Sequence, residues 1–128
     1  MKAKYTVLIL DDENVLADIL EGNITRLYDG HTFHVINESD GIRALKIIED
    51  SEIHIDVLIT DLMHPGVSGI DLIRTVREKF TNVKIIVQTG FGDREILDQC
   101  RVYADTVLKK PFKIIELTNA IQNLLPAK

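Results

Sequence analysis

The chain has 128 residues, 45% hydrophobic and 27% charged, which is typical of one soluble globular domain spanning residues 1–128. A formal net charge of −5 and a pI near 5.3 exclude a basic surface that follows phosphates, so we expect no direct nucleic-acid binding by this domain. No apolar run approaches the roughly 18 residues that span a bilayer, no segment resembles a signal peptide, and the single cysteine allows no internal disulfide, so we expect a cytoplasmic protein without a membrane partner.

Short apolar runs alternate with segments of helical periodicity from the amino end onward. Each run is rich in β-branched residues and nearly continuous in apolar character, which predicts strands of a parallel sheet covered on both faces. The strands are expected at residues 5–10, 32–36, 55–60, 83–88 and 106–109.

Between these runs, apolar residues recur every three to four positions, which predicts amphipathic helices. Asp40 and Ser68 stand at expected N-caps, and Pro126 follows the last helix. The helices are expected at residues 16–27, 40–48, 68–80, 96–100 and 114–125, the fourth being the weakest. This alternation predicts an α/β fold, a doubly wound five-stranded parallel sheet flanked by five helices. The sequence leaves the direction of the first two crossovers open, and we favour the strand order 2-1-3-4-5.

Charged and polar residues stand where the expected strands end. Asp11 and Asp12 follow the first strand and Asp61 follows the third, at the edge where a doubly wound sheet places its site. Neighbouring parallel strands lie about 4.8 Å apart, so these carboxylates meet and repel unless a cation neutralises them. Their hard oxygen ligands suit Mg²⁺. Thr89 after the fourth strand and Lys110 after the fifth would add a hydroxyl and an ammonium for a phosphoryl group.

Each of these residue types has a structural explanation when it is taken singly. A carboxylate can cap a helix or begin a turn, a threonine can be an ordinary strand-end residue, and a lysine can simply be solvated. Their coincidence at one edge of one sheet favours a shared site over these separate explanations.

Four motifs stand in order along the whole chain: Asp11-Asp12, Asp61-Leu62-Met63-His64-Pro65-Gly66, Thr89 and Lys110-Pro111-Phe112. Together they resemble the receiver domain of two-component response regulators, which has a flavodoxin-like fold. The resemblance implies that Asp61 accepts a phosphoryl group from the phosphohistidine of a sensor histidine kinase or phosphotransfer protein. It implies Thr89 as the switch hydroxyl and Lys110 as the partner of the phosphoryl group.

The resemblance also implies a Mg²⁺ site. Its ligands would be Asp12, Asp61 and the backbone carbonyl of Met63, with Asp11 holding a metal-bound water or a second position. It further implies a cis peptide before Pro111.

A receiver domain is not a turnover enzyme on a separate substrate. By the same resemblance, it would act on an unidentified downstream protein and could dimerise on phosphorylation through its fourth helix, fifth strand and last helix.

Side chains alternate along a strand, so only one of Lys109 and Lys110 can reach the site. The lysine that precedes proline, Lys110, matches the family.

The chain departs from the family pattern at two places. Val107 replaces the usual Tyr or Phe of the fifth strand, so we expect switching to rely on the loop that contains Gly90 and Gly92. Met63 and Phe91 flank the family's path for hydrolytic water, and their bulk predicts a long-lived phosphoaspartate.

Two other functions compete with this interpretation. A small Mg²⁺-dependent phosphatase with Asp61 as nucleophile would need a further acid and an inserted lid, and we find no insertion of that length. A flavodoxin-like cofactor binder would need a Gly- and hydroxyl-rich phosphate cradle, which these loops lack. The histidines share no ligand spacing, and Cys100 is expected to be a core thiol.

Overall fold

A computed structural model describes residues 4–11, 18–19, 32–62, 68–90 and 94–125. The strands are β1 (Lys4–Leu10), β2 (Thr32–Glu38), β3 (Val57–Asp61), β4 (Lys84–Thr89) and β5 (Thr106–Lys109). The helices are α2 (Gly41–Glu49), α3 (Gly69–Lys79), α4 (Arg94–Tyr103) and α5 (Ile114–Leu124). The five expected strands and four of the five expected helices are therefore confirmed. The first expected helix, at 16–27, lies outside the described residues except for 18–19, which are helical.

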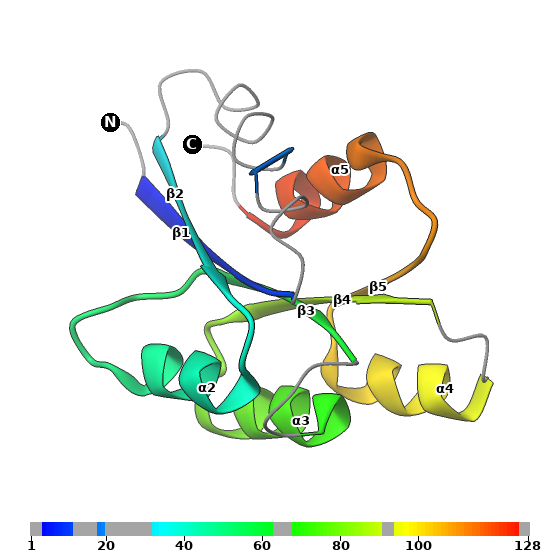
Figure 1. Cartoon of the computed structure of the whole chain (residues 1–128), viewed down its shortest axis with the longest axis horizontal. Coiled ribbons are helices and arrows are strands. Elements are labelled where there is room, and N and C mark those ends of the chain that lie inside the picture. Colours follow the sequence, from blue (N-terminus) through cyan, green and yellow to red (C-terminus); the bar gives the residue numbers. More distant parts are fainter. Residues whose placement is uncertain (1–3, 12–17, 20–31, 63–67, 91–93, 126–128) are drawn as a thin grey trace.

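The strands form one parallel sheet in the order β2-β1-β3-β4-β5, as the sequence predicted (Figure 1). Leu10 of β1 pairs with Thr60 of β3, so the residues that follow, Asp11 and Asp61, stand at the same level of adjacent strands. On the other side of β3, Asp61 pairs with Gln88 of β4. The register therefore sets one polar residue on each of three neighbouring strands at the carboxyl edge of the sheet.

Helices cover both faces of the sheet. Figure 1 shows α5 on one face and α2, α3 and α4 on the other. Because side chains alternate along each strand, they supply two separate apolar clusters. The α5-face cluster includes Val7, Ile9, Val57, Ile59, Ile86, Leu117 and Ile121. The three-helix cluster includes Leu8, Leu10, Leu58, Leu72, Val76, Ile85 and Val87.

Cys100 of α4 is buried in the three-helix cluster, which confirms the expected core thiol. Burial raises the pKa of the Cys100 thiol, and the nearby Arg101 guanidinium offsets this only in part. Because the thiolate is the reactive form, this cysteine is a packing residue and not a nucleophile.

The two expected N-caps have different outcomes. The Asp40 carboxylate accepts hydrogen bonds from the backbone N–H groups of Ile42 and Arg43, at 2.7 and 3.2 Å, and so caps α2. Ser68 occupies the N-cap position of α3, but its side chain makes no capping hydrogen bond. The expectation that the Ser68 hydroxyl caps α3 was therefore wrong.

Gly69, the first residue of α3, packs directly against the backbone that follows Asp61. A Cβ atom added to Gly69 would lie 2.7 Å from both the Cα and the carbonyl oxygen of Leu62. These are backbone atoms, so they cannot rotate away as a side chain would. The start of α3 is therefore held close to the carboxyl end of β3.

We expect Gly69→Ala to lower the free energy of unfolding by about 2 kcal/mol, because the new methyl group forces the Leu62 and α3 backbones apart. Urea denaturation measures the loss. Gly90→Ala is the matched control, since a Cβ atom there would meet nothing within 4 Å. Equal losses in the two variants would contradict this explanation.

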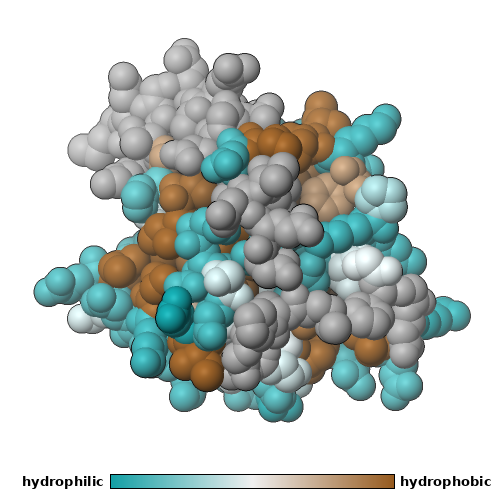
Figure 2. All heavy atoms as spheres, viewed as in Figure 1, coloured by the Kyte–Doolittle hydropathy of each residue, from teal (hydrophilic) through white to brown (hydrophobic). Residues whose placement is uncertain are grey.

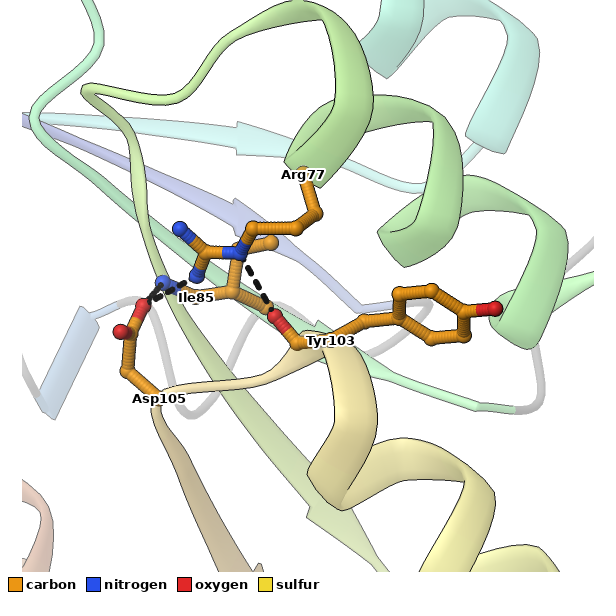
Figure 3. A network of polar contacts seen from close by, with 4 residues as sticks. All are labelled: Arg77, Ile85, Tyr103 and Asp105. Atoms are coloured by element: carbon orange, nitrogen blue, oxygen red, sulfur yellow. Dashed lines mark hydrogen bonds and ion pairs between the residues drawn. The ribbon is translucent and has the colours of Figure 1, made fainter.

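A second set of contacts ties α3, β4 and β5 together at the amino ends of the strands (Figure 3). Asp105 Oδ2 accepts from the backbone N–H of Ile85 at 2.8 Å and pairs with Arg77 Nη2 at 2.5 Å. Arg77 Nε donates to the carbonyl of Tyr103 at 2.8 Å. One carboxylate and one guanidinium thus join the end of α3 and the start of β4 to the segment between α4 and β5.

We expect Asp105→Ala to cost about 2 kcal/mol of unfolding free energy, because it leaves the Ile85 N–H without its acceptor and removes one of two acceptors of the half-buried Arg77. Asp105→Asn keeps one acceptor oxygen, so its loss of unfolding free energy should be smaller. Asp98→Ala is the control, because Asp98 forms only an exposed pair with Arg101 and such pairs contribute little. Chemical denaturation of the three variants tests the order of these effects.

Candidate functional site

The carboxyl ends of β3, β4 and β5 bring Asp61, Thr89 and Lys110 to one edge of the sheet. Lys110 Nζ lies 2.5 Å from Asp61 Oδ2, so of the two adjacent lysines it is Lys110 that reaches this carboxylate. The Lys110 backbone N–H donates to the carbonyl of Thr89 at 2.8 Å. The peptide between Lys110 and Pro111 is cis, as predicted. Backbone and side chain of Lys110 thus connect the ends of β4 and β3.

Asp11 supplies a second carboxylate at the same edge. Its backbone N–H donates to the Glu38 carbonyl at 3.0 Å, which fixes the end of β1 beside the end of β2. The residue is only 4% exposed. Its Oδ2 accepts a hydrogen bond of 2.9 Å from Nε2 of Gln88, a residue of β4 with no exposed surface.

The two carboxylates and the ammonium leave this small, largely water-excluded region with a net negative charge. The Asp61 side chain is 14% exposed and that of Lys110 is 40% exposed. Charges interact more strongly where water is excluded, so a cation that entered here would gain more than it would at the open surface. The region is therefore suited to bind a cation together with an anionic group that Lys110 can also contact.

Gln88 is a site residue that the sequence analysis did not identify. It is a polar residue that directly follows three apolar ones, Ile85, Ile86 and Val87. By alternation it faces the same side of the sheet as Ile86 and as its neighbour Asp61. A polar residue that interrupts a buried strand one position before its end was the signal that could have found it.

The other predicted site residues differ in what the structure shows of them. Thr89 is fully buried at the end of β4. Asp12, Met63 and Phe91 lie outside the described residues. Val107, the residue in place of the family's aromatic, is half-buried and packs against the three-helix cluster.

Two observations bear on whether Mg²⁺ fits this edge. Among residues 4–11, 18–19, 32–62, 68–90 and 94–125, no three His, Cys, Asp or Glu side chains gather closely enough to hold a metal. Asp11 and Asp61 nevertheless supply carboxylates, and Gln88 Oε1 is a buried oxygen without a hydrogen-bond partner. Carboxylate and amide oxygens with bound water are the ligand chemistry of Mg²⁺, so the residues present fit the ion.

A family model described as the response regulator receiver domain matches residues 7–122. The regulatory protein VanR of Enterococcus faecium is 36% identical over 114 residues, which are 87% of this chain and 46% of VanR. Sporulation initiation phosphotransferase F of Bacillus subtilis is 24% identical over 123 residues, 95% of this chain and 94% of the relative. The chain spans about half or less of the length of most curated relatives that it matches.

Solved structures give the same result. Response regulator protein TrrA of Thermotoga maritima, determined in complex with Mg(2+)-BeF, superposes with a TM-score of 0.77 at 26% identity. The match covers 94% of this chain and 99% of that protein. The similarity therefore extends across nearly the whole of both chains.

Proposed function

The chain belongs to the response regulator receiver domain family, and from this we propose that it takes up a phosphoryl group on Asp61 in phosphorelay signalling. The observation that carries the proposal is the contact of Lys110 with Asp61, beside a second carboxylate at the carboxyl edge of the sheet. The donor would be the phosphohistidine of a sensor histidine kinase or of a phosphotransfer protein.

The proposed reaction is an in-line transfer between two residues of different proteins. An oxygen of the Asp61 carboxylate attacks phosphorus, the phosphorus–nitrogen bond of the phosphohistidine breaks, and the imidazole leaves with that electron pair. Lys110 offsets negative charge on the transferring group, and the Thr89 hydroxyl donates a hydrogen bond to it. The product is an acyl phosphate on Asp61, which water later hydrolyses.

We propose that Asp11, Asp12, Asp61 and the Met63 carbonyl hold Mg²⁺ at this site, directly or through water. When bound, the ion supplies positive charge next to the oxygens of the phosphoryl group. The site's own contribution is to bring carboxylates from neighbouring strands to one edge of the sheet and to keep Lys110 in contact with Asp61.

The proposed output is a change in protein binding. Val102 of α4 and Ile115 of α5 are 72% and 61% exposed, which supports a partner or dimer surface on α4, β5 and α5. Figure 2 shows apolar side chains at the surface over α5, between hydrophilic ones. The proposed downstream target is a protein, and we also propose a long-lived phosphoaspartate and a switching role for the loop that contains Gly90.

We further propose that residues 1–128 form one receiver domain that works in the cytoplasm without binding nucleic acid or membrane itself. None of the helices in the described part of the chain has the length and apolar character needed to cross a bilayer. The acidic net charge of −5 supports the exclusion of nucleic acid.

Labelling with a small acyl phosphate, followed by intact mass measurement, tests the proposed function. We expect an adduct of one phosphoryl group per chain that forms with Mg²⁺ and not with EDTA, and that maps to the peptide containing Asp61. The alternative, a small Mg²⁺-dependent phosphatase with Asp61 as nucleophile, predicts repeated turnover of phosphate monoesters instead. Absence of the adduct, or its location on another peptide, would overturn the proposal.

A further inference from the structure

Gln88 forms a side-chain link across the strand that carries Asp61. The sheet order places β3 between β1 and β4. Gln88 of β4 is the register partner of Asp61, yet its Nε2 donates to Asp11 beyond the end of β1, 2.9 Å away. The Gln88 side chain therefore crosses β3 at the level of Asp61 and contacts Asp11 on the far side of that strand.

The orientation of this carboxamide follows from its neighbour. An ionised carboxylate only accepts hydrogen bonds, so the N–H side of the amide must face Asp11. Turning the amide over would set two oxygens against each other. The oxygen Oε1 is thus held in place by the bond to Asp11, and it is buried without a hydrogen-bond partner.

A buried acceptor without a donor destabilises a protein, so such atoms in folded proteins call for an explanation. Gln88 has no exposed surface, and neighbouring β4 residues Ile86 and Val87 are wholly apolar and equally buried. An apolar residue at this position would continue the strand pattern, but it would also remove the donor to Asp11 Oδ2. The bond to Asp11 thus accounts for the N–H side of the amide and leaves Oε1 unsatisfied in the cation-free protein, which points to a donor that arrives from outside the chain.

We propose that Gln88 is a positioning residue of the cation site, holding Asp11 through its N–H and accepting through Oε1 a hydrogen bond from a water bound to the cation. This inference rests on the proposed function, since it concerns the same Mg²⁺ site. Groups that hydrogen-bond metal ligands orient them, and they influence affinity without touching the ion. Gln88 immediately precedes Thr89, so it would also tie the occupied site to the end of β4.

The test compares Mg²⁺ affinity, measured by isothermal titration calorimetry without any phosphodonor, in the wild-type chain and in Gln88→Met. Methionine has the length of glutamine but no hydrogen-bonding amide. We expect Mg²⁺ to bind about tenfold or more weakly to Gln88→Met, which is the range found when such supporting groups are removed. Gln99→Met is the matched control, because Gln99 is exposed on α4, and it should bind Mg²⁺ like the wild type.

Stability with and without Mg²⁺ separates positioning from a purely structural role. In EDTA, Gln88→Met removes the unsatisfied oxygen but also the donor to the buried Asp11 carboxylate, so these effects on stability oppose each other. We expect Mg²⁺ to raise the urea midpoint of unfolding more in the wild type than in Gln88→Met. A variant that is destabilised in EDTA yet binds Mg²⁺ with unchanged affinity would show that the link only joins β1 to β4, and would overturn the inference.

In the wild type, the side-chain amide signals of Gln88 in ¹⁵N spectra should shift with Mg²⁺ while those of Gln99 stay unchanged.

The two levels of the proposal fail in different ways. If the wild type is labelled on Asp61 but all variants bind Mg²⁺ equally, only the role of Gln88 is overturned. If the wild type binds Mg²⁺ and Gln88→Met binds it weakly, but no phosphoryl adduct forms, only the proposed function is overturned. A wild-type chain that binds no Mg²⁺ would overturn both.

Discussion

Asp61→Asn should take up no phosphoryl group under conditions that label the wild-type chain. The amide that replaces the carboxylate carries no negative oxygen to attack phosphorus, so the transfer loses its nucleophile. The measurement is the intact mass after incubation with an acyl phosphate and Mg²⁺. Asp98→Asn, a change of the same kind at an exposed position on α4, should be labelled normally.

The shape of asparagine keeps this result interpretable. Its amide oxygen can still accept the hydrogen bond that Lys110 gives to Asp61 Oδ2, so the carboxyl edge of the sheet should stay folded. Circular dichroism and urea unfolding would verify this. Labelling of Asp61→Asn at the wild-type level would place the phosphoryl group on another residue.

Lys110→Met should slow phosphoryl uptake by about 10²-fold or more, the effect seen when one preorganised charge-stabilising group is removed from an active site. The ammonium already lies 2.5 Å from Asp61 Oδ2, so no rearrangement is needed to bring it to the transferring group. The rate is measured from the growth of the phosphorylated species at saturating Mg²⁺ with an acyl phosphate donor.

Lys109→Met is the control for this prediction. Lys109 is the adjacent residue with the same charge, pairs with Thr89 in the sheet, and is exposed on the opposite side of the strand from Lys110. Lys109→Met changes the net charge of the protein by the same amount as Lys110→Met, but it leaves the contact between Lys110 and Asp61 in place. If both substitutions slowed phosphoryl uptake by the same factor, the effect would come from overall charge and not from the contact with Asp61.

The strands could be predicted because each depends on a strong local pattern, whereas their order was favoured from the general topology of doubly wound sheets. Continuous β-branched runs at regular intervals define buried parallel strands, and alternation with helices restricts the topology. The meeting of Asp11 and Asp61 at one edge follows from the strand order. Side-chain alternation allows only one of Lys109 and Lys110 to reach Asp61, and the resemblance to the receiver family selected Lys110, which the structure confirms.

The missed features depend on contacts between distant segments. Gln88 resembles an ordinary strand residue until the register shows that its side chain crosses β3 to Asp11. Gly69 is required by the approach of the Leu62 backbone, and the pairing of Arg77 with Asp105 joins α3 to the start of β5. A local sequence pattern does not specify which distant segments come into contact.

The N-caps show that even a local rule depends on its surroundings. Asp40 and Ser68 both belong to the residue types that favour the start of a helix, and both precede helices. Only Asp40 forms the capping bonds. At Ser68 the chain instead brings Gly69 against the backbone of Leu62, so close packing fixes the start of α3 where a side-chain bond was expected.

The division of the apolar interior has a consequence for how the protein can change over evolution. The α5-face cluster and the three-helix cluster have no residue in common, because the backbone of the sheet lies between them. A loss of volume at Ile59 can thus be compensated from α5, for example at Leu117, but not from α3. Substitutions on opposite faces should have additive energies, whereas epistasis should be confined to pairs within one face.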